Sequence, residues 1–323
     1  MLNLKKEILR VTSASNILET QSVQNLWSGY GEIKRYQLEE GKFKSIIAKH
    51  IQLSDGQQHP KGWNTSSSHQ RKLKSYQVER VWYQNYAHLT DENCRVPKAL
   101  HSTETEMEML IIMEDLNESG YPHRHNPDNI TLPNVKSCLK WLANFHAKFM
   151  NNPAEGLWPI GTYWHLDTRP DEWDKMNNLS LKNTAKAIDE KLNQAQYQTI
   201  IHGDAKLANF CFGNNNNVAA VDFQYVGKGC GMKDVAYFIS SCFEEEECEK
   251  YEEELLGHYF NELDKALDNT LDFKSLKSEW QKLYKYAWAD FYRFLDGWSP
   301  GHWKMHDYSQ RLTQEVLSEL DLK

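Results

Sequence analysis

Alternating apolar and polar positions in the first third of the chain predict strands. Residues 31–38 and 43–51 show this pattern on either side of a glycine-containing turn, which predicts a hairpin. Apolar runs at residues 95–100 and 107–116 add two further strands. Residues 69–89 instead carry apolar side chains at the spacing of a helix. The pattern therefore predicts an antiparallel sheet with one helix in this part of the chain.

The rest of the chain has a mainly helical pattern that is interrupted by one hairpin. Residues 132–150 and about 246–322 carry apolar side chains at helical spacing. Between them, the segments 200–212 and 218–223, which contain apolar residues of strand character, flank four consecutive asparagines, residues 214–217. Asparagine tolerates left-handed backbone geometry, so this segment predicts a tight turn. The predicted fold class is therefore α+β, with a sheet followed by helices.

Three further segments have weaker patterns. Residues 1–25 have mixed polarity, with apolar positions that favour a helix packed on the sheet. Residues 53–68 are rich in Gly, Ser, Asn and Gln and predict a loop, either a lid over a nucleotide or an insertion without chemistry. Residues 227–231 contain three glycines and predict a flexible turn.

Composition excludes several classes of protein. The chain of 323 residues has 37 Lys and Arg against 45 Asp and Glu, and the net charge of −8 argues against nucleic acid as a partner. Mean hydropathy is −0.73, and no apolar run approaches the ~18 residues of a membrane helix. The first residues lack the apolar core of a secretory signal. Six cysteines without a Cys-x-x-Cys pair predict the reduced thiols of a cytoplasmic protein, while nothing indicates its oligomeric state.

The hairpin region carries a set of polar residues suited to phosphoryl transfer. Asp204 and Asn209 lie in the loop before the hairpin and Asp222 closes its second strand, so we expect the three side chains to meet. Asn209 and Asp222 are predicted metal ligands, because Mg²⁺ prefers carboxylate and amide oxygens. Asp204 would accept the proton of an attacking hydroxyl, and Lys206 would lie near the transferred phosphoryl group. The structural alternative is that Asp204 only caps a turn and Asp222 only ends a strand.

Two features of the predicted sheet are suited to a nucleotide. Lys49 follows Ile46-Ile47-Ala48 on a strand, like the phosphate-contacting lysine of the V-A-I-K pattern, and Glu79 on the following helix would orient it. Gly29 and Gly31 lack Cβ atoms and would let backbone N–H groups approach phosphates. Each has a structural alternative: a solvated strand lysine, a surface glutamate, or the glycines of a turn or bulge.

The motifs around the hairpin resemble those of a known group of enzymes. His202-Gly203-Asp204 with Asn209, followed by Val221-Asp222-Phe223, resembles the aminoglycoside phosphotransferase and choline kinase branch of the protein-kinase-like fold. Within this branch the chain most resembles the ecdysteroid-kinase-like small-molecule phosphotransferases. The resemblance implies a two-lobed fold with a nucleotide-binding lobe at residues 1–115 and a catalytic and acceptor-binding lobe at residues 116–323. It also implies ATP and Mg²⁺ as cofactors, and transfer of the γ-phosphoryl group to a hydroxyl of a small organic molecule.

The same resemblance suggests roles for residues outside the hairpin. Glu114, at the end of the second apolar run, would belong to a hinge whose backbone holds adenine. Asp234 resembles the Asp of the family's Asp-Leu-Ala motif, which braces the catalytic loop. A C-terminal aromatic cluster would either build the acceptor site, as in related kinases, or simply pack the core: Trp288, Tyr292, Trp298 and Trp303.

Two departures from protein kinases narrow the predicted function. Gly203 replaces the arginine that pairs with a phosphorylated activation loop in many protein kinases. Only 12 residues separate Asp222 from Asp234, which leaves no room for a long peptide-binding activation segment. The alternatives are a pseudokinase that binds nucleotide without turnover, a protein kinase, and a metal-dependent hydrolase that uses His202, Asp204 and Asp222.

Overall fold

A computed structural model describes residues 2–26, 29–52, 66–268 and 270–321, so most of the predicted loop at residues 53–68 lies outside the described residues. A five-stranded antiparallel sheet forms the first part of the chain, in the order β1-β2-β3-β5-β4. Its strands are β1 (Asn16–Asn25), β2 (Gly31–Glu39), β3 (Ser45–Gln52), β4 (Ala99–Glu104) and β5 (Glu108–Glu114). The predicted hairpin is thus formed by β2 and β3.

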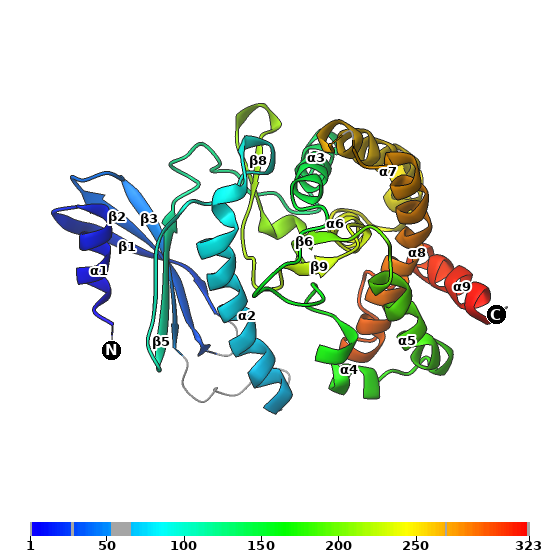
Figure 1. The fold of residues 1–323 in the computed structure, drawn as a ribbon. Helices are drawn as coiled ribbons and strands as arrows, with labels where there is room; N and C mark the ends of the chain where they lie inside the picture. The colour runs from blue at the N-terminus through cyan, green and yellow to red at the C-terminus, as the bar shows by residue number, and fades with distance from the viewer. Residues whose placement is uncertain (1, 27–28, 53–65, 269, 322–323) are drawn as a thin grey trace.

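Two helices cover the two faces of this sheet. Helix α1 (Leu4–Thr12) lies on one face, and α2 (Ser66–Asn85) lies on the other, between the sheet and the rest of the molecule (Figure 1). Alternate residues of β5 supply the two faces, since Ile112 packs in the core under α1 and Ile111 packs in the core with Trp82 of α2. The strand β5 is buried along its whole length, which fits its place inside the sheet.

Two predictions for this region were wrong in their extent. Residues 1–25 do not form one helix, because α1 ends at Thr12, the following Ser13 has a left-handed backbone with φ of 58°, and β1 comes next. Most side chains of this edge strand are exposed, so its sequence lacks the alternation that marks a half-buried strand. The strand predicted at residues 95–100 begins only at Ala99, just after Pro97, which cannot donate a ladder hydrogen bond.

Helices dominate the remainder of the chain. They are α3 (Leu132–Lys148), α4 (Pro170–Asp174), α5 (Leu179–Asn193), α6 (Met232–Cys242), α7 (Glu245–Ala266), α8 (Phe273–Trp298) and α9 (Asp307–Asp321). Short 3₁₀ turns lie at Ala87–Leu89, Glu92–Cys94, Leu166–Thr168, Leu207–Asn209 and Asn214–Asn216. Where one continuous helical region was predicted after residue 246, breaks separate α7, α8 and α9. None of the helices in the described ranges is long and apolar enough to span a bilayer.

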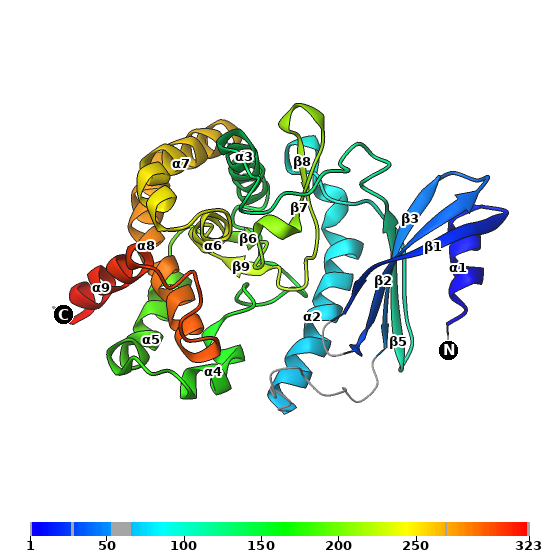
Figure 2. The same ribbon diagram turned by 180° about the vertical axis from the view of Figure 1, so that it is seen from behind.

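Two small antiparallel sheets sit between the main sheet and these helices. Strands β7 (Phe210–Phe212) and β8 (Val218–Ala220) form the predicted hairpin, and Asn215 and Asn216 in its turn have φ of 58° and 61°. Strands β6 (Thr199–Ile201) and β9 (Gly227–Gly229) form the second pair, so the predicted flexible turn at residues 227–231 is in fact part of a strand. Seen from behind, β7 and β8 lie between the large sheet and α3 (Figure 2).

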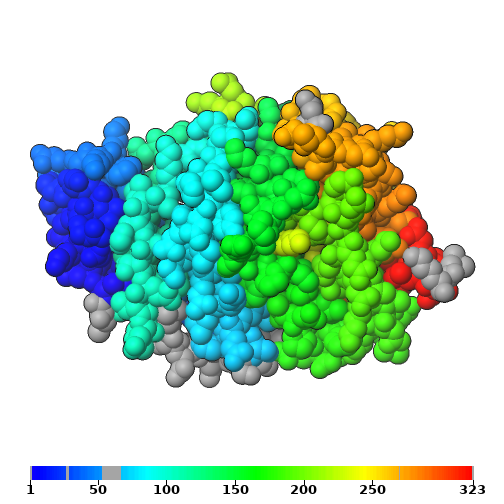
Figure 3. Space-filling view, viewed as in Figure 1, coloured from blue at the N-terminus to red at the C-terminus, as the bar shows by residue number. Residues whose placement is uncertain are grey.

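Contacts across α2 join the sheet to the helical part. The surface of α2 lies directly against the segment that follows α3 (Figure 3). Arg71 of α2 donates to Thr168 O at 2.7 Å, and Tyr86 donates to Glu155 O at 2.8 Å. Trp82 of α2 stacks on Phe223, which directly follows Asp222, with 4.4 Å between ring centroids. The helix therefore fixes the sheet relative to the polar hairpin loop.

The six cysteines are buried as free thiols.

Candidate active site

The loop between β6 and β7 brings three predicted site residues together. Lys206 Nζ lies 3.1 Å from Asp204 Oδ2. Asn209 Nδ2 donates to both Asp204 O, at 2.7 Å, and Asp204 Oδ2, at 3.2 Å. The amide nitrogen of Asn209 is thereby occupied, so its carbonyl oxygen is the atom left to accept a cation. The pKa of Lys206 is raised, chiefly by the carboxylate of Asp204.

The conformation of this loop explains why Gly203 stands where many protein kinases have arginine. Gly203 has φ of 77°, and a Cβ atom at this position would lie 2.0 Å from Tyr225 O. Any side chain here would collide with backbone and would also be strained in this left-handed conformation. Glycine therefore allows the segment around Tyr225 to pack directly on the loop that carries Asp204.

Asp234 holds the same loop in place through hydrogen bonds to its backbone. It lies in the first turn of α6, fully buried, and its two oxygens accept His202 N at 2.6 Å and Gly203 N at 2.9 Å. His146 Nε2 of α3 lies 3.2 Å from Asp234 Oδ2. The predicted brace is thus present, and Asp234 holds the backbone directly before Asp204.

Asp222 lies two residues after the end of β8, beside this loop. Val221 N donates to Asn209 O at 2.9 Å, which holds the two predicted metal ligands next to each other. The backbone of Asp222 has φ of 69°, a left-handed conformation that is uncommon for a residue other than glycine and that concentrates at functional sites. Burial alone would raise the pKa of Asp222, but the ammonium groups of Lys49, Lys206 and Lys72 lower it to about 2. Its carboxylate is therefore ionised at neutral pH.

Lys49 reaches Asp222 from the large sheet. Its Nζ lies 2.6 Å from Glu79 Oε2 and 3.5 Å from Asp222 Oδ1. The side chains of Lys49 and Glu79 are each only 2% exposed. Burial would lower the pKa of Lys49, but the two carboxylates outweigh it and raise the pKa. Neither residue is therefore the solvated surface group that the sequence left as an alternative.

Of the two predicted glycines, Gly29 lies in the connection between β1 and β2, and Gly31 is the first residue of β2. Gly31 has φ of 135°, and a Cβ atom there would lie 2.0 Å from His50 O of β3, so the close packing of the sheet requires this glycine. Gly29 N donates to Leu26 O at 3.2 Å within the same turn. Residues 27–28 lie outside the described ranges. Contact of the glycines with phosphates stays a prediction.

Glu114, the predicted hinge residue, ends β5. Its carboxylate pairs with the guanidinium of Arg95 and accepts Lys98 N at 2.7 Å. Its own backbone N–H donates to Lys98 O at 3.0 Å. Since the N–H is engaged, an adenine contact at Glu114 could use only the carbonyl group. The side chain fastens the end of the sheet, and the adenine contact stays a prediction.

Sequence reasoning missed two residues near Asp204. The hydroxyl of Tyr237 on α6 donates to Asp204 Oδ1 at 3.2 Å. The ammonium of Lys304, from the segment between α8 and α9, lies 4.8 Å from the centroid of the Tyr237 ring. Tyr237 follows Asp234 by three residues, about one helical turn, and this spacing is the one signal that could have placed it beside the loop. No comparable signal marks Lys304.

The predicted C-terminal aromatic cluster divides into two parts. Trp288 is 1% exposed and belongs to the core, as the packing alternative predicted. Trp298 stacks on Phe294 in a cluster that also contains Tyr237, and the ring centroid of Trp303 lies 5.3 Å from Lys304 Nζ. Tyr292 packs on the same core as Trp288, and an acceptor contact by Trp298 or Trp303 stays a prediction.

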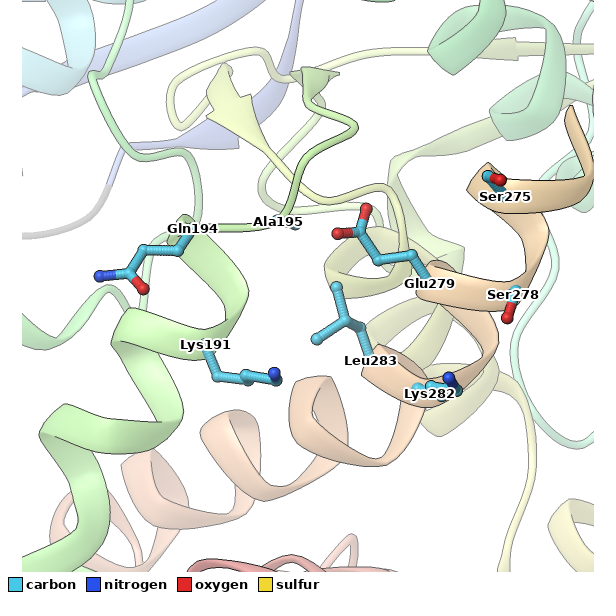
Figure 4. Close-up of a pocket in the computed structure, with 8 residues that line it drawn as sticks. All are labelled: Lys191, Gln194, Ala195, Ser275, Ser278, Glu279, Lys282 and Leu283. Carbon is cyan, nitrogen blue, oxygen red and sulfur yellow. The ribbon is translucent and has the colours of Figure 1, made fainter. Parts of the chain in front are cut away.

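One surface hollow lies apart from these residues, between α5 and α8 (Figure 4). Its lining consists of Lys191, Gln194, Ala195, Ser275, Ser278, Glu279, Lys282 and Leu283. The carboxylate of Glu279 already accepts Gln196 N at 2.8 Å and Tyr197 N at 3.1 Å. This hollow contains none of the predicted site residues.

The donor atoms at the hairpin suit a hard cation. No group of three or more His, Cys, Asp or Glu side chains in the described ranges is arranged to hold a metal ion. Mg²⁺ does not require such a group, because it binds through one or two protein ligands together with water and substrate phosphates. The free amide oxygen of Asn209 and the ionised carboxylate of Asp222 fit this requirement.

Comparison with known proteins places this geometry in context. Over residues 39–152 and 163–271 the sequence matches the Ecdysteroid kinase-like family, whereas none of the curated proteins compared matches it. Similar solved structures include a thermostable mutant of aminoglycoside phosphotransferase APH(4)-Ia in a ternary complex with ADP and hygromycin B, at 9% identity, 98% coverage of both chains and a TM-score of 0.53. Aminoglycoside phosphotransferase APH(4)-Ia itself is 12% identical, with 88% of this chain and 98% of that chain covered and a TM-score of 0.50. Choline kinase LicA from Streptococcus pneumoniae is 12% identical over 99% of this chain and 98% of that chain, with a TM-score of 0.48. The predicted α+β kinase-like fold is confirmed.

Proposed function

We propose that this chain, which belongs to the ecdysteroid kinase-like family, transfers the γ-phosphoryl group of ATP to a hydroxyl group of a small organic molecule. Family membership indicates a small-molecule phosphotransferase in general, and the nucleotide, the acceptor group and the residues involved are our proposal. The observation that carries it is the convergence of Asp204, Asn209 and Asp222 with the buried ion pair of Lys49 and Glu79.

Asp204 is the proposed base. Lys206, Asn209 and Tyr237 each contact its carboxylate, so the side chain is held in one orientation. As the acceptor hydroxyl attacks the γ-phosphorus, its proton passes to a carboxylate oxygen of Asp204. The bond between the γ-phosphorus and the bridging oxygen breaks at the same time, and ADP leaves with the bonding electrons.

Charge on the phosphates is the second requirement of this chemistry. Lys49, oriented by Glu79, is proposed to contact the nucleotide phosphates, and Lys206 is proposed to lie beside the transferred group. Asn209 and Asp222 would hold Mg²⁺, which would neutralise charge on the phosphate oxygens. The similar aminoglycoside phosphotransferase APH(4)-Ia was solved in a complex with ADP, which supports an adenine nucleotide as the phosphoryl donor proposed for this chain.

The proposal divides the chain at the end of β5. Residues 1–115 would form the nucleotide-binding lobe, in which Gly29, Gly31 and the carbonyl of Glu114 face the nucleotide. Residues 116–323 would form the catalytic and acceptor-binding lobe. The cleft between the two would then run past Asp222.

Phosphorylation of a panel of alcohols tests the proposal. Wild type and Asp204→Asn are incubated with ATP and Mg²⁺ and with amino-sugars, choline-like amines, sugars, sterol alcohols and hydroxy acids, and products are detected by mass. We expect at least one acceptor to gain a phosphoryl group with wild type and to do so far more slowly with the variant. Binding of ATP without transfer to any alcohol would contradict the proposal and favour a pseudokinase. Cleavage of phosphoesters without ATP would favour a hydrolase.

A further inference from the structure

Lys304 is a buried cation beside the proposed base. It lies in the segment between α8 and α9, and the residue is only 8% exposed. Its ammonium group faces three aromatic rings, with centroids 4.8 Å away for Tyr237, 5.5 Å for Phe291 and 5.3 Å for Trp303. The three rings stabilise the ammonium through cation–π interactions, and we refer to this arrangement as the aromatic box of Lys304.

The box lacks an anion. Within the described ranges, no carboxylate forms an ion pair with Lys304, and its hydrogen bond goes to a hydroxyl, Ser240 Oγ at 3.4 Å. Burial lowers the pKa of Lys304 to about 8. Removing a cation from water without a paired anion is unfavourable, so a fixed position of this kind suits a group that gains its partner from a ligand.

Tyr237 connects this box to the proposed reaction centre. Its ring faces Lys304, and its hydroxyl donates to Asp204 Oδ1 at 3.2 Å. The charges of Asp204 and Lys206 both act on Lys304, which places the three groups in one region. Lys304 therefore approaches Asp204 from the segment between α8 and α9, whereas Lys49 approaches Asp222 from the sheet.

Lys72 is a half-buried lysine in the same region, and its charge acts on Asp222. Lys72 of α2 donates to Gln224 Oε1 at 3.1 Å and lies over the Tyr76 ring, so its described contacts are an amide and an aromatic ring. Glu172, a nearby carboxylate, is already paired with Arg169 at 2.9 Å.

We propose that the ammonium of Lys304, which the rings of Tyr237, Phe291 and Trp303 hold in position, binds an anionic oxygen group of the acceptor, such as a carboxylate, sulfate or phosphate ester. Binding there would hold the acceptor with a hydroxyl directed toward Asp204. The inference rests on the proposed function, since it specifies the acceptor of that reaction. It predicts a hydroxyl compound that carries negative charge, in preference to an amine.

Matched ligands of opposite charge test the proposal by calorimetry. The probes are para-(hydroxymethyl)benzoate and para-(hydroxymethyl)benzylamine, titrated into protein that is saturated with ADP and Mg²⁺. We expect wild type to bind the benzoate about tenfold or more tightly than the amine, because a buried ammonium would pair with the carboxylate. Lys304→Met should abolish the preference, and Lys304→Arg should retain it.

A matched control separates this effect from a general loss of positive charge. Lys265→Met removes an exposed ammonium on α7 that pairs with Glu262, and it should bind both probes like wild type. The proposal is overturned if wild type prefers the amine or does not bind the benzoate, or if Lys304→Met keeps the preference.

The same probes, supplied with ATP in place of ADP, distinguish the two proposals. Preferential benzoate binding without any phosphoryl transfer would support the subsite and contradict the proposed function. Transfer to alcohols with no dependence on charge or on Lys304 would support the function and overturn the subsite.

Discussion

Two buried lysines in the same region of this molecule have opposite surroundings. Lys49 pairs with Glu79 and lies near Asp222, and these carboxylates raise its pKa. Lys304 faces aromatic rings and a serine hydroxyl, and burial lowers its pKa to about 8. Both are shielded from water, so the difference lies in the anions that the protein supplies.

This difference separates a completed part of the site from an incomplete one. The chain itself provides the carboxylates around Lys49. This is expected if Lys49 holds phosphate groups in a fixed place, as proposed. Around Lys304 the described residues provide aromatic rings and a serine hydroxyl, but no carboxylate in an ion pair with it. The comparison therefore predicts that the nucleotide side is preassembled and that the acceptor completes the other side.

Asp204 lies between the two lysines, and its removal should have the largest effect. Asp204→Asn keeps the shape of the side chain but removes the proposed proton acceptor, so turnover should fall by about 10²-fold or more. ATP affinity measured by calorimetry should change little, because the predicted nucleotide contacts lie on Lys49 and Asp222. Equal turnover of wild type and variant with the same acceptor would exclude Asp204 as the base.

Removing the partner of Lys49 should be the next largest effect. Glu79→Gln leaves a buried ammonium with only Asp222, at 3.5 Å, and should lower the free energy of unfolding by about 3 kcal/mol. Urea denaturation followed by tryptophan fluorescence measures this. Glu315→Gln breaks an exposed pair with Arg311 and should cost under about 0.5 kcal/mol. Similar losses in both variants would mean that the buried pair has no special role.

A second variant sharpens the test of Lys49. Lys49→Met combined with Glu79→Leu replaces the ion pair by apolar groups of similar size and should recover most of the stability that Glu79→Gln loses. Phosphoryl transfer should remain impaired, because the phosphate contact is gone. Recovery of both stability and activity would show that the pair only supports the fold.

Removing the charge of Lys304 should have the opposite effect on stability. The folded-state pKa of about 8 is below the ordinary 10.5, so protonation favours the unfolded chain, and this penalty is fully present at pH 7. Lys304→Met should therefore raise the free energy of unfolding by up to roughly 3 kcal/mol at pH 7, while it weakens benzoate binding. A lysine that served only the fold would instead lose stability on substitution.

The smallest expected effect is a pH dependence of acceptor binding. As pH rises from 7 to 9, Lys304 passes through its pKa of about 8, and the benzoate preference should fall by up to roughly tenfold. The other groups that act on Lys304 are Asp204, Lys206, Cys242 and Cys248. Burial raises the pKa of Cys242 to about 12 and raises the pKa of Cys248 further. The carboxylate of Asp204 raises the pKa of Lys206. Lys304→Arg should show no such fall in calorimetric titrations across this range.

Local patterns in the sequence were enough to predict the proximity of the hairpin residues. Asp204, Asn209 and Asp222 lie within one short loop and hairpin, so their meeting depends on few long-range contacts. The approach of Glu79 to Lys49 could be predicted because each lies in a periodic element, a strand and the helix that packs on it. Their chemical roles stay predictions.

Other features depended on contacts that no local pattern encodes. Lys304 is far from Asp204 in the chain, and the Gly and Pro residues before it give no periodicity. Strand β9 was predicted as a turn because its glycines suggest flexibility, although a Cβ atom at Gly227 would lie 2.3 Å from Trp158 O. The position of Glu114 was right as the end of a strand, but its pairing with Arg95 became visible only in three dimensions.

Transfer of isotopic label from ATP tests the central claim most directly. Wild type and Asp204→Asn are incubated with Mg²⁺ and with ATP labelled with heavy oxygen in its γ-phosphoryl group, together with the best acceptor alcohol from the panel. The account predicts that the label appears in a phosphate ester of the alcohol with wild type and that it is nearly absent with the variant. Label that appears only in inorganic phosphate, or equally in the ester with both proteins, would contradict it.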